Sequence, residues 1–397
     1  MSCYTIAKKV VQKIVHHGYI AYFAGGCVRD RLLNHPFDDI DIATDAPVEE
    51  IQKLFSKTIP VGIQFGILIV VVEGHQFEVA TFRKETGYKD GRRPNHIEKA
   101  TPQEDAQRRD FTINGMFFDP ISEQIHDFVN GQEDLQKKLI RAIGDPHERF
   151  LEDRLRMIRA VRYAARLHFS IDPPTIAAIL THAPDLFPAV AIERIVQELK
   201  KMSLFPNFPL ALSTLHRFQL LHQIFPQLNC LTEHELSDRL KHLPHFPSST
   251  PLVLKLFELF GSISLEEKMQ LCDYLKLSTQ DKRLVEELHL WLQFDLQLDD
   301  YDLATLYAKP NAFLCLDIAA LHSPNPNFKK FHQRKLDSLT FAVKRKQSGK
   351  TLVTSAHLKE RGVAPGPEMG KLLAKAERVA VNHRYDSVSA VLNHLNL

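Results

Sequence analysis

The stretch Phe23-Ala24-Gly25-Gly26-Cys27-Val28-Arg29-Asp30, followed by Asp38-Asp39-Ile40-Asp41-Ile42-Ala43-Thr44, decides the fold. An apolar run over residues 19–24 leads into two glycines, and a short amphipathic helix is expected over 28–33. Two acids separated by one apolar residue come next. Because residues i and i+2 of a strand project from the same face, the carboxylates of Asp39 and Asp41 are expected side by side. The flanking isoleucines would then point into a core.

Two adjacent carboxylates repel each other unless a cation lies between them. Mg²⁺ prefers oxygen ligands and is commonly held by one or two carboxylates plus substrate phosphates. Two glycines before a helix N-terminus let backbone N–H groups approach a phosphate closely. Either fragment alone is more often a solvated strand edge or a turn. Their order and spacing predict a site for a metal ion and a triphosphate.

The composition is that of an ordinary globular protein, and 397 residues allow two to four domains. No apolar run is long enough to span a bilayer, and no signal-peptide pattern is present. The five cysteines are scattered without a Cys-x-x-Cys pair, which argues against zinc ribbons and favours a reducing, cytoplasmic location. A net charge of +2 means that a nucleic acid would have to be held by local basic patches.

Two strands are predicted after the acidic stretch. The apolar run 66–72 indicates a central strand buried on both faces, and the alternating run 75–82 indicates its hairpin partner. Glu78 would be a third carboxylate on the neighbouring strand, or simply an exposed strand acid. Residues 83–107 are polar and rich in turn formers, which predicts a surface loop.

Basic residues gather in two later segments. Adjacent guanidiniums at Arg108 and Arg109 suit phosphate, and a carboxylate such as Asp110 can accept a hydrogen bond from a ribose hydroxyl. Residues 152–166 are good helix formers and predict one continuous helix, with a basic stripe along one face. Glu152 and Arg156 are four residues apart and are expected to form an ion pair. On charge pattern alone, a solvated helix is the commoner outcome.

These motifs together resemble those of the class II tRNA nucleotidyltransferases, the CCA-adding enzymes, and of the related bacterial poly(A) polymerases. The resemblance covers nearly the whole chain and is weakest between about 205 and 345. It implies an α+β fold, with an N-terminal mixed-sheet head of the polymerase beta-like nucleotidyltransferase type followed by all-α parts. The expected domains are a catalytic head (1–140), a neck (141–204), a body (205–340) and a tRNA-binding tail (341–397).

The resemblance also implies roles for individual residues. Asp39, Asp41 and Glu78 would be catalytic, with Mg²⁺ held by Asp39 and Asp41. Asp153 and Arg156 would read the Watson–Crick edge of C or A, so that the protein acts as its own template. The segment 191–199 would brace that helix, with Arg194 either a support or an ordinary ion-pair partner. The residues implied for nucleotide binding are Gly25, Gly26, Arg29, Asp30, Arg108, Arg109, Asp110, Asn114, Glu152, Asp153, Arg156, Arg159 and Arg162.

The function implied is addition of CCA, or of its terminal A, to the 3′ end of tRNA from CTP and ATP. A full-length segment after Arg83 favours addition of the A. A poly(A) polymerase is the alternative, but the basic segment that follows the catalytic acids in those enzymes is not visible after Thr44. A non-catalytic RNA-binding protein is a third possibility, and the intact acids at 39 and 41 argue against it. The sequence does not indicate the oligomeric state.

Overall fold

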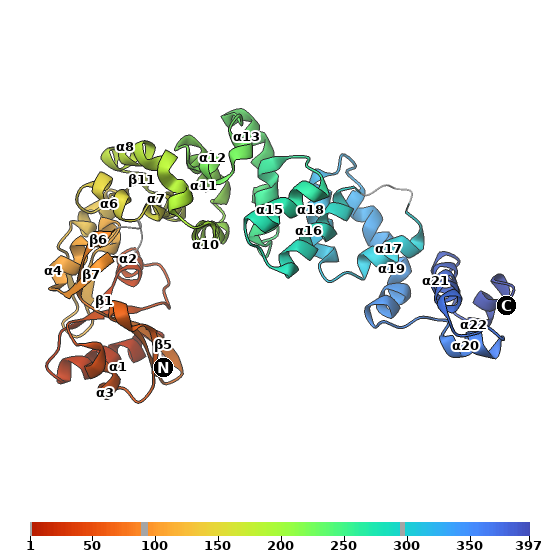
Figure 1. Ribbon diagram of the computed structural model, residues 1–397, viewed down its shortest axis with the longest axis horizontal. Helices are drawn as coiled ribbons and strands as arrows, with labels where there is room; N and C mark the ends of the chain where they lie inside the picture. Colours follow the sequence, from red (N-terminus) through yellow and green to blue (C-terminus); the bar gives the residue numbers. More distant parts are fainter. Residues whose placement is uncertain (1, 89–93, 294–297) are drawn as a thin grey trace. The chain divides into compact units, whose positions relative to one another are not determined.

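The computed structural model describes residues 2–88, 94–293 and 298–397 (Figure 1). The chain divides into two compact units, Met1–Ser237 and Asp238–Leu397. The finer division at residues 140, 204 and 340 stays a prediction. Within the described ranges no helix combines the length and the apolar character needed to cross a membrane.

The first unit contains a seven-stranded mixed sheet in the order β3-β4-β5-β2-β1-β8-β9. Only β2 and β5 are parallel among its neighbouring strands. The strands are β1 (Ala21–Ala24), β2 (Asp41–Thr44), β3 (Thr58–Gly62), β4 (Ile67–Val72), β5 (His75–Thr81), β8 (Phe117–Asp119) and β9 (Gln124–His126). The predicted head with a mixed sheet is confirmed.

The parallel pairing of β2 with β5 fixes which acids are neighbours. Ile42 is opposite Val79 and Ala43 is opposite Ala80. One residue earlier along each strand, Asp41 and Glu78 lie on the same face, because neighbouring strands in register share their pleat. A third acid next to the first two is therefore a property of the sheet register.

One detail of the predicted sheet is wrong. The run 66–72 was expected to be buried on both faces, but β4 alternates, with Leu68 and Val70 buried and its other residues partly exposed. The reason is its position, because β4 lies second from the sheet edge and only one of its faces is packed. The hairpin partner predicted over 75–82 is confirmed as β5, antiparallel to β4.

The helices of the first unit surround this sheet and continue beyond it. They are α1 (Cys3–His16), α2 (Gly26–Leu32), α3 (Val48–Leu54), α4 (Pro102–Gln107), α5 (Gly131–Gln136), α6 (Pro146–Glu152), α7 (Leu155–Leu167), α8 (Pro173–His182), α9 (Leu186–Ala189), α10 (Ile192–Ser203), α11 (Phe208–Arg217), α12 (Leu220–Ile224) and α13 (Glu233–Leu240), the last of which runs past the boundary of the unit. A short parallel pair, β10 (Leu139–Ile140) and β11 (Ser170–Ile171), lies beside α7.

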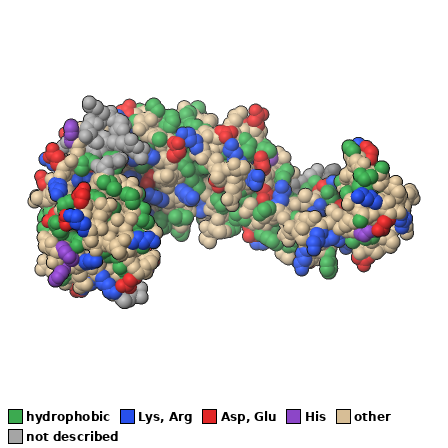
Figure 2. Space-filling view, turned by 60° about the horizontal axis from the view of Figure 1, so that its bottom comes forward, with side chains coloured by type: hydrophobic (Ala, Val, Ile, Leu, Met, Phe, Trp, Pro, Cys, Tyr) green, Lys and Arg blue, Asp and Glu red, His purple; other side chains and the backbone are tan. Residues whose placement is uncertain are grey.

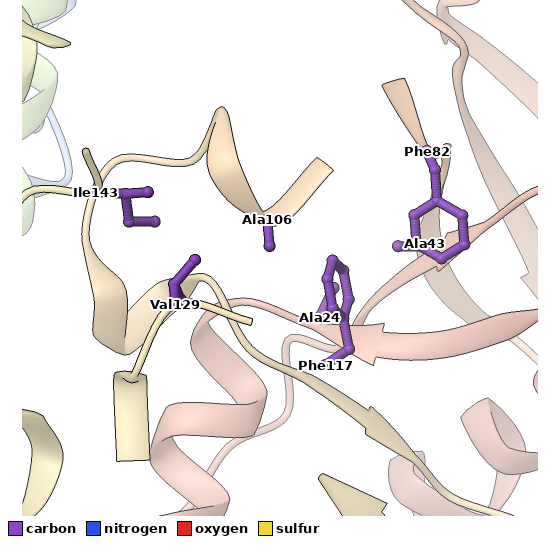
Figure 3. Packing of buried hydrophobic residues seen from close by; sticks show 7 residues of the cluster. All are labelled: Ala24, Ala43, Phe82, Ala106, Phe117, Val129 and Ile143. Carbon is purple, nitrogen blue, oxygen red and sulfur yellow. The ribbon is translucent and has the colours of Figure 1, made fainter. Parts of the chain in front are cut away.

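A buried cluster anchors α4 to the sheet (Figure 3). Ala24 of β1 and Ala43 of β2 are small, which leaves room for the rings of Phe82 and Phe117, packed edge to face with centroids 5.6 Å apart. Ala106 of α4 joins the same cluster. The two arginines that follow α4 are thereby held at a fixed place next to β1 and β2.

The loop predicted over 83–107 is largely wrong. Its first part forms β6 (Arg83–Tyr88), its second part forms β7 (Pro94–Lys99), and the two pair as an antiparallel hairpin. Residues 102–107 form α4, begun by a capping box in which Thr101 and Glu104 exchange hydrogen bonds. The hairpin has no apolar alternation to reveal it. Glu85 of β6 forms ion pairs with Arg83 (2.6 Å) on the same strand and with Arg108 (3.2 Å) after α4, which connects β6 to the segment that follows α4.

The prediction of a single helix over 152–166 is also wrong, because the helix is interrupted at Asp153. Helix α6 ends at Glu152 and α7 begins at Leu155. Asp153 has extended backbone angles, and its carboxylate accepts the N–H of Leu155 at 3.1 Å, which is how an Asp competes with helix continuation. The Glu152–Arg156 ion pair is confirmed at 2.6 Å across this break.

The second unit is helical throughout its described part, as the predicted all-α body and tail require. Its helices are α14 (Leu252–Phe257), α15 (Leu265–Tyr274), α16 (Thr279–Leu292), α17 (Asp300–Tyr307), α18 (Ala312–His322), α19 (Phe328–Gln347), α20 (Ser355–Glu360), α21 (Pro367–Asn382) and α22 (Val388–His394). Its centre includes the only tryptophan, Trp291, whose ring lies 5.1 Å from the buried ring of His332. On the face in Figure 2, Lys and Arg side chains are interspersed with acidic and apolar ones.

Candidate active site

A cavity of about 770 Å³ lies in the first unit, lined by the ends of β1 and β2 and by α2, α7 and α10. Most residues predicted for catalysis or nucleotide binding line it: Gly25, Gly26, Arg29, Asp30, Asp39, Asp41, Arg108, Arg109, Asp110, Asn114, Asp153, Arg156, Arg159 and Arg162. Glu78 lies outside it, in an adjoining cavity of about 210 Å³ that Asp41 shares. Glu152 lines neither.

Asp39 and Asp41 are both exposed, and only Asp41 belongs to β2, because Asp39 precedes the strand. Desolvation by the cavity wall and the negative charges of Glu78 and Asp39 raise the pKa of Asp41 to about 7, against the opposing charge of Arg109. In the described part of the chain neither Asp39 nor Asp41 forms an ion pair or accepts a hydrogen bond through its side chain. Two crowded carboxylates without a counter-ion are the donor set that a hard divalent cation would satisfy.

The protein alone does not complete a metal site. Among the described residues no group of three or more His, Cys, Asp and Glu side chains is arranged to hold a metal ion. Two carboxylates fit Mg²⁺ nevertheless, because this ion keeps several waters and takes further oxygens from substrate phosphates. The residues present therefore fit Mg²⁺ bound together with a triphosphate.

Gly25 is required by its backbone and by its neighbour. Its φ of +75° lies in the region that favours glycine, and a Cβ there would come within 3.2 Å of Nη1 of Arg109. Its N–H donates to the carbonyl of Met116, which fixes the turn between β1 and α2. The guanidinium of Arg109 can therefore lie directly over the turn.

A single buried carboxylate orients both arginines of the Arg-Arg pair. Asp105 on α4 accepts from Nε of Arg108 at 2.9 Å and from Nε and Nη2 of Arg109 at 3.1 and 3.0 Å. It also accepts the backbone N–H of Arg83. Burial opposes ionisation of Asp105, but the two guanidiniums outweigh it and lower its pKa. Sequence reasoning missed this residue, although its spacing of three and four from the arginines on a helix is a recognisable signal.

Asp110 was predicted to read the ribose, and its oxygens already have partners. One accepts from Nε and Nη2 of Arg159 at 2.8 and 2.5 Å, and the other accepts from the N–H of Phe111 and the amide of Asn114. Burial alone would raise the pKa of Asp110, but Arg159 dominates and lowers it to about 2. Asp110 therefore ties the segment after α4 to α7.

Arg29 and Arg162 line the cavity but are almost fully buried. Arg29 donates to both oxygens of Asp30 at 2.9 Å and to Asn114 at 2.7 Å, and Asp30 also pairs with Arg166. Nε of Arg162 donates to the buried Glu198 on α10 at 2.5 Å. Arg29 therefore joins α2 to the segment at Asn114, and Arg162 joins α7 to α10.

The predicted base-reading pair has a support behind each member. Arg194 on α10 donates from Nη1 and Nη2 to the two oxygens of Asp153, at 3.1 and 2.8 Å. Arg156 donates to Glu152 and to the carbonyls of Arg149 and Arg108. A guanidinium has five N–H donors and each carboxylate oxygen has two lone pairs, so both groups keep capacity for a ligand.

Tyr163 was missed by the sequence reasoning. Its ring lies 4.1 Å from the guanidinium of Arg162, 5.2 Å from that of Arg29 and 5.6 Å from that of Arg159. An aromatic face among cations is favourable through its quadrupole. No pattern within the motif marked it, since its role depends on Arg29, more than a hundred residues earlier.

A mixed sheet that ends in two free carboxylates, beside a cavity walled by oriented arginines, defines a nucleotidyltransferase. In agreement, residues 21–141 match the family model described as the poly A polymerase head domain, and residues 168–231 match the one described as a probable RNA and SrmB-binding site of polymerase A. The chain belongs to the CCA-adding enzyme family, as full-length relatives show. The resemblance predicted from the motifs is confirmed.

Two relatives and one structure illustrate the match. A CCA-adding enzyme of Limosilactobacillus reuteri is 33% identical over 414 residues, which cover 97% of this chain and 94% of the relative. One of Pediococcus pentosaceus is 34% identical over 409 residues, covering 98% and 97%. The crystal structure of the Bacillus stearothermophilus CCA-adding enzyme in complex with CTP superposes with a TM-score of 0.81 at 26% identity, covering 100% of this chain and 98% of that one.

Proposed function

We propose that this chain adds C, C and A in turn to the 3′ end of tRNA from CTP and ATP, and that nucleotidyl transfer takes place at Asp39 and Asp41. Full-length likeness to CCA-adding enzymes supports the reaction. The observation that carries the site is the pair of free, exposed carboxylates next to a cavity walled by arginines.

Asp39 and Asp41 would hold Mg²⁺, which when bound supplies the positive charge that activates the RNA hydroxyl and stabilises the leaving pyrophosphate. Side chains of the protein itself would bind the triphosphate and act on the RNA. Arg109, over the Gly25 turn, would bind triphosphate oxygens, with Asp105 orienting its guanidinium. Glu78, beside Asp41 but outside the nucleotide cavity, would act on the RNA end.

Base selection is assigned to Asp153 and Arg156. One offers acceptors and the other offers donors, which together match the Watson–Crick edges of C and A. Arg194 orients the side chain of Asp153, and Glu152 orients that of Arg156. Arg29 and Arg162 were expected to contact the nucleotide. Their burial favours a different proposal, that they position Asp30, Asn114 and α7 around it.

The test is incorporation of labelled CTP and ATP by purified protein, with an RNA minihelix that ends before the CCA. Asp39→Ala and Asp41→Ala should each abolish incorporation, because the metal would lose a ligand. Glu49→Gln is the matched control, since Glu49 is an exposed acid on α3 outside the cavity. Normal incorporation by Asp39→Ala would overturn the assignment of the site.

The same assay decides the product. RNAs that end before, within and after CCA are offered with each nucleotide alone. We expect growth to stop at CCA. Continued addition of A beyond that point would indicate a poly(A) polymerase. Addition of A to an RNA ending in CC, without any addition of C to the shorter RNAs, would indicate an A-adding enzyme. We further propose a cytoplasmic location, which the five free cysteines favour.

A further inference from the structure

The second unit contains a cavity of its own, of about 520 Å³. It lies among α15, α16, the end of α18 and the segment 238–263. Cationic and titratable side chains dominate the polar part of its lining, which consists of Asp238, Arg239, Lys241, His242, Glu258, Lys268, His289 and His322, with Ser262 and Gln293. None of these residues belongs to the candidate active site.

Lys268 is the central feature of this lining. The residue is only 8% exposed, and its ammonium donates to Nδ1 of His289 at 3.1 Å. Within the described ranges it forms no ion pair, and Glu258 is the acid whose charge reaches it. Burial accordingly lowers the pKa of Lys268. A buried ammonium without a counter-ion is costly, and an anion delivered to it would offset that cost.

The neighbouring donors face the same space. Because Nδ1 of His289 accepts from the ammonium, its proton is on Nε2, which is therefore a donor. Arg239 donates from Nη1 to the carbonyl of Leu259, a contact that fixes the guanidinium at the cavity wall. An ammonium, an imidazole N–H and a guanidinium are the donors with which proteins bind phosphate.

Two acids also line this cavity, Asp238 and Glu258, and Glu258 is engaged by a histidine. Glu258 lies 3.2 Å from Nε2 of His322, whose ring packs against that of His242 with centroids 4.7 Å apart. The described residues here also offer no cluster able to hold a metal ion. The cavity therefore presents cations without offering a metal site.

From this arrangement we infer that the cavity between α15 and α16 binds a phosphate group, with the buried Lys268 as its central ligand and His289 and Arg239 beside it. The group is either inorganic phosphate or pyrophosphate, or a phosphate of an RNA backbone. This site is additional to the proposed active site and does not depend on it.

Equilibrium dialysis of the full-length protein against labelled inorganic phosphate, without Mg²⁺, tests the site. Lys268→Met, which keeps length and removes charge, should lose one bound phosphate per chain or weaken it at least about tenfold, as loss of a buried charged partner does. Lys268→Arg should retain binding, and His289→Leu should weaken it. Lys282→Met is the matched control, since Lys282 is on α16, is paired with Asp273 and does not line the cavity.

Two further readouts complete the experiment. Without phosphate, Lys268→Met should unfold at a higher temperature than the native chain, because it removes a buried cation, and phosphate should raise its melting temperature less. Filter binding of tRNA then separates the sources: weaker binding by Lys268→Met indicates an RNA phosphate, and unchanged binding indicates a free one. Equal phosphate stoichiometry and affinity in the native chain, Lys268→Met and His289→Leu would overturn the inference.

Discussion

Arg194 and Asp153 form a two-pronged ion pair, with Nη1 on Oδ1 at 3.1 Å and Nη2 on Oδ2 at 2.8 Å. The pair joins α10 to the break between α6 and α7. Because both oxygens are held, the plane of the Asp153 carboxylate is fixed before any nucleotide arrives. The proposed base-reading edge thus depends on a residue forty-one positions away in the chain.

The first prediction concerns this support. Arg194→Lys keeps the charge but cannot donate in two parallel directions. We expect kcat/KM for CTP and for ATP to fall by about 10- to 100-fold, as the loss of a charge-assisted hydrogen bond implies, and incorporation of UTP to rise relative to CTP. Steady-state incorporation with each nucleotide measures both. Arg217→Lys, at an exposed pair with Glu233, is the control. Unchanged base preference in Arg194→Lys would contradict the proposal.

The second prediction concerns Glu78. Glu78→Gln keeps the shape of the side chain and removes the charge beside Asp41. Since Glu78 lies outside the nucleotide cavity, we expect CTP affinity to stay unchanged while turnover falls by about 100- to 10,000-fold, the range for a lost general acid–base group. Single-turnover kinetics with separately measured CTP binding distinguish the two quantities. Full turnover would mean that Glu78 is only an exposed strand acid.

The third prediction is a pH dependence of stability in the second unit. Burial lowers the pKa of His332 from 6.5 to about 4. Between these two pH values His332 is protonated in the unfolded chain but neutral in the folded one. The free energy of unfolding therefore falls as the pH drops from about 6.5 to about 4, and it levels off below that. The loss is of the order of 3 kcal/mol.

Fluorescence of Trp291, next to His332, reports unfolding of this unit during urea titrations at several pH values. His332→Asn keeps an acceptor for the hydroxyl of Tyr307, which lies 2.8 Å from Nδ1 of His332, and removes the titrating ring. The free energy of unfolding of His332→Asn should depend less steeply on pH between about 4 and about 6.5, the folded and unfolded pKa values of His332. Parallel curves for the two proteins would refute the prediction.

The fourth prediction concerns packing under the sheet. Gly131 begins α5, and a Cβ on it would collide with the carbonyl of Thr112 and lie 2.8 Å from Cγ of Met116. Gly131→Ala should lower the free energy of unfolding by about 1–3 kcal/mol, as overpacking does. Gly370→Ala, inside α21 with no atom near its Cβ position, should instead be neutral or slightly stabilising. Thermal unfolding of both variants provides the comparison.

Much of the fold could be predicted because its signals are local. The Gly25-Gly26 turn, the acids at 39 and 41 and the alternation of 75–82 each follow from a few adjacent residues. The antiparallel pairing of β6 (83–88) with β7 (94–99) could not be recognised, since neither strand carries an apolar alternation and the contact of Glu85 with Arg108 exists only after folding. The break at Asp153 was hidden for a similar reason, because Arg194 holds that residue from another helix.

In the candidate site, too, local motifs could be predicted and long-range contacts could not. The residue types around the cavity could be named from their motifs, but which arginines face a ligand and which face the interior could not. Arg29 and Arg162 resemble phosphate ligands in sequence and are buried in the structure. Arg29 is paired with its neighbour Asp30 on α2, whereas Arg162 meets Glu198 only because α10 packs against α7.

Glu85 connects strand β6 to the wall of the cavity. One carboxylate contacts Arg83 at the start of the hairpin and Arg108 at the wall of the nucleotide cavity. A shift of the hairpin cannot leave Arg108 where it stands without breaking one of these contacts. The position of β6 and that of Arg108 are therefore mechanically coupled.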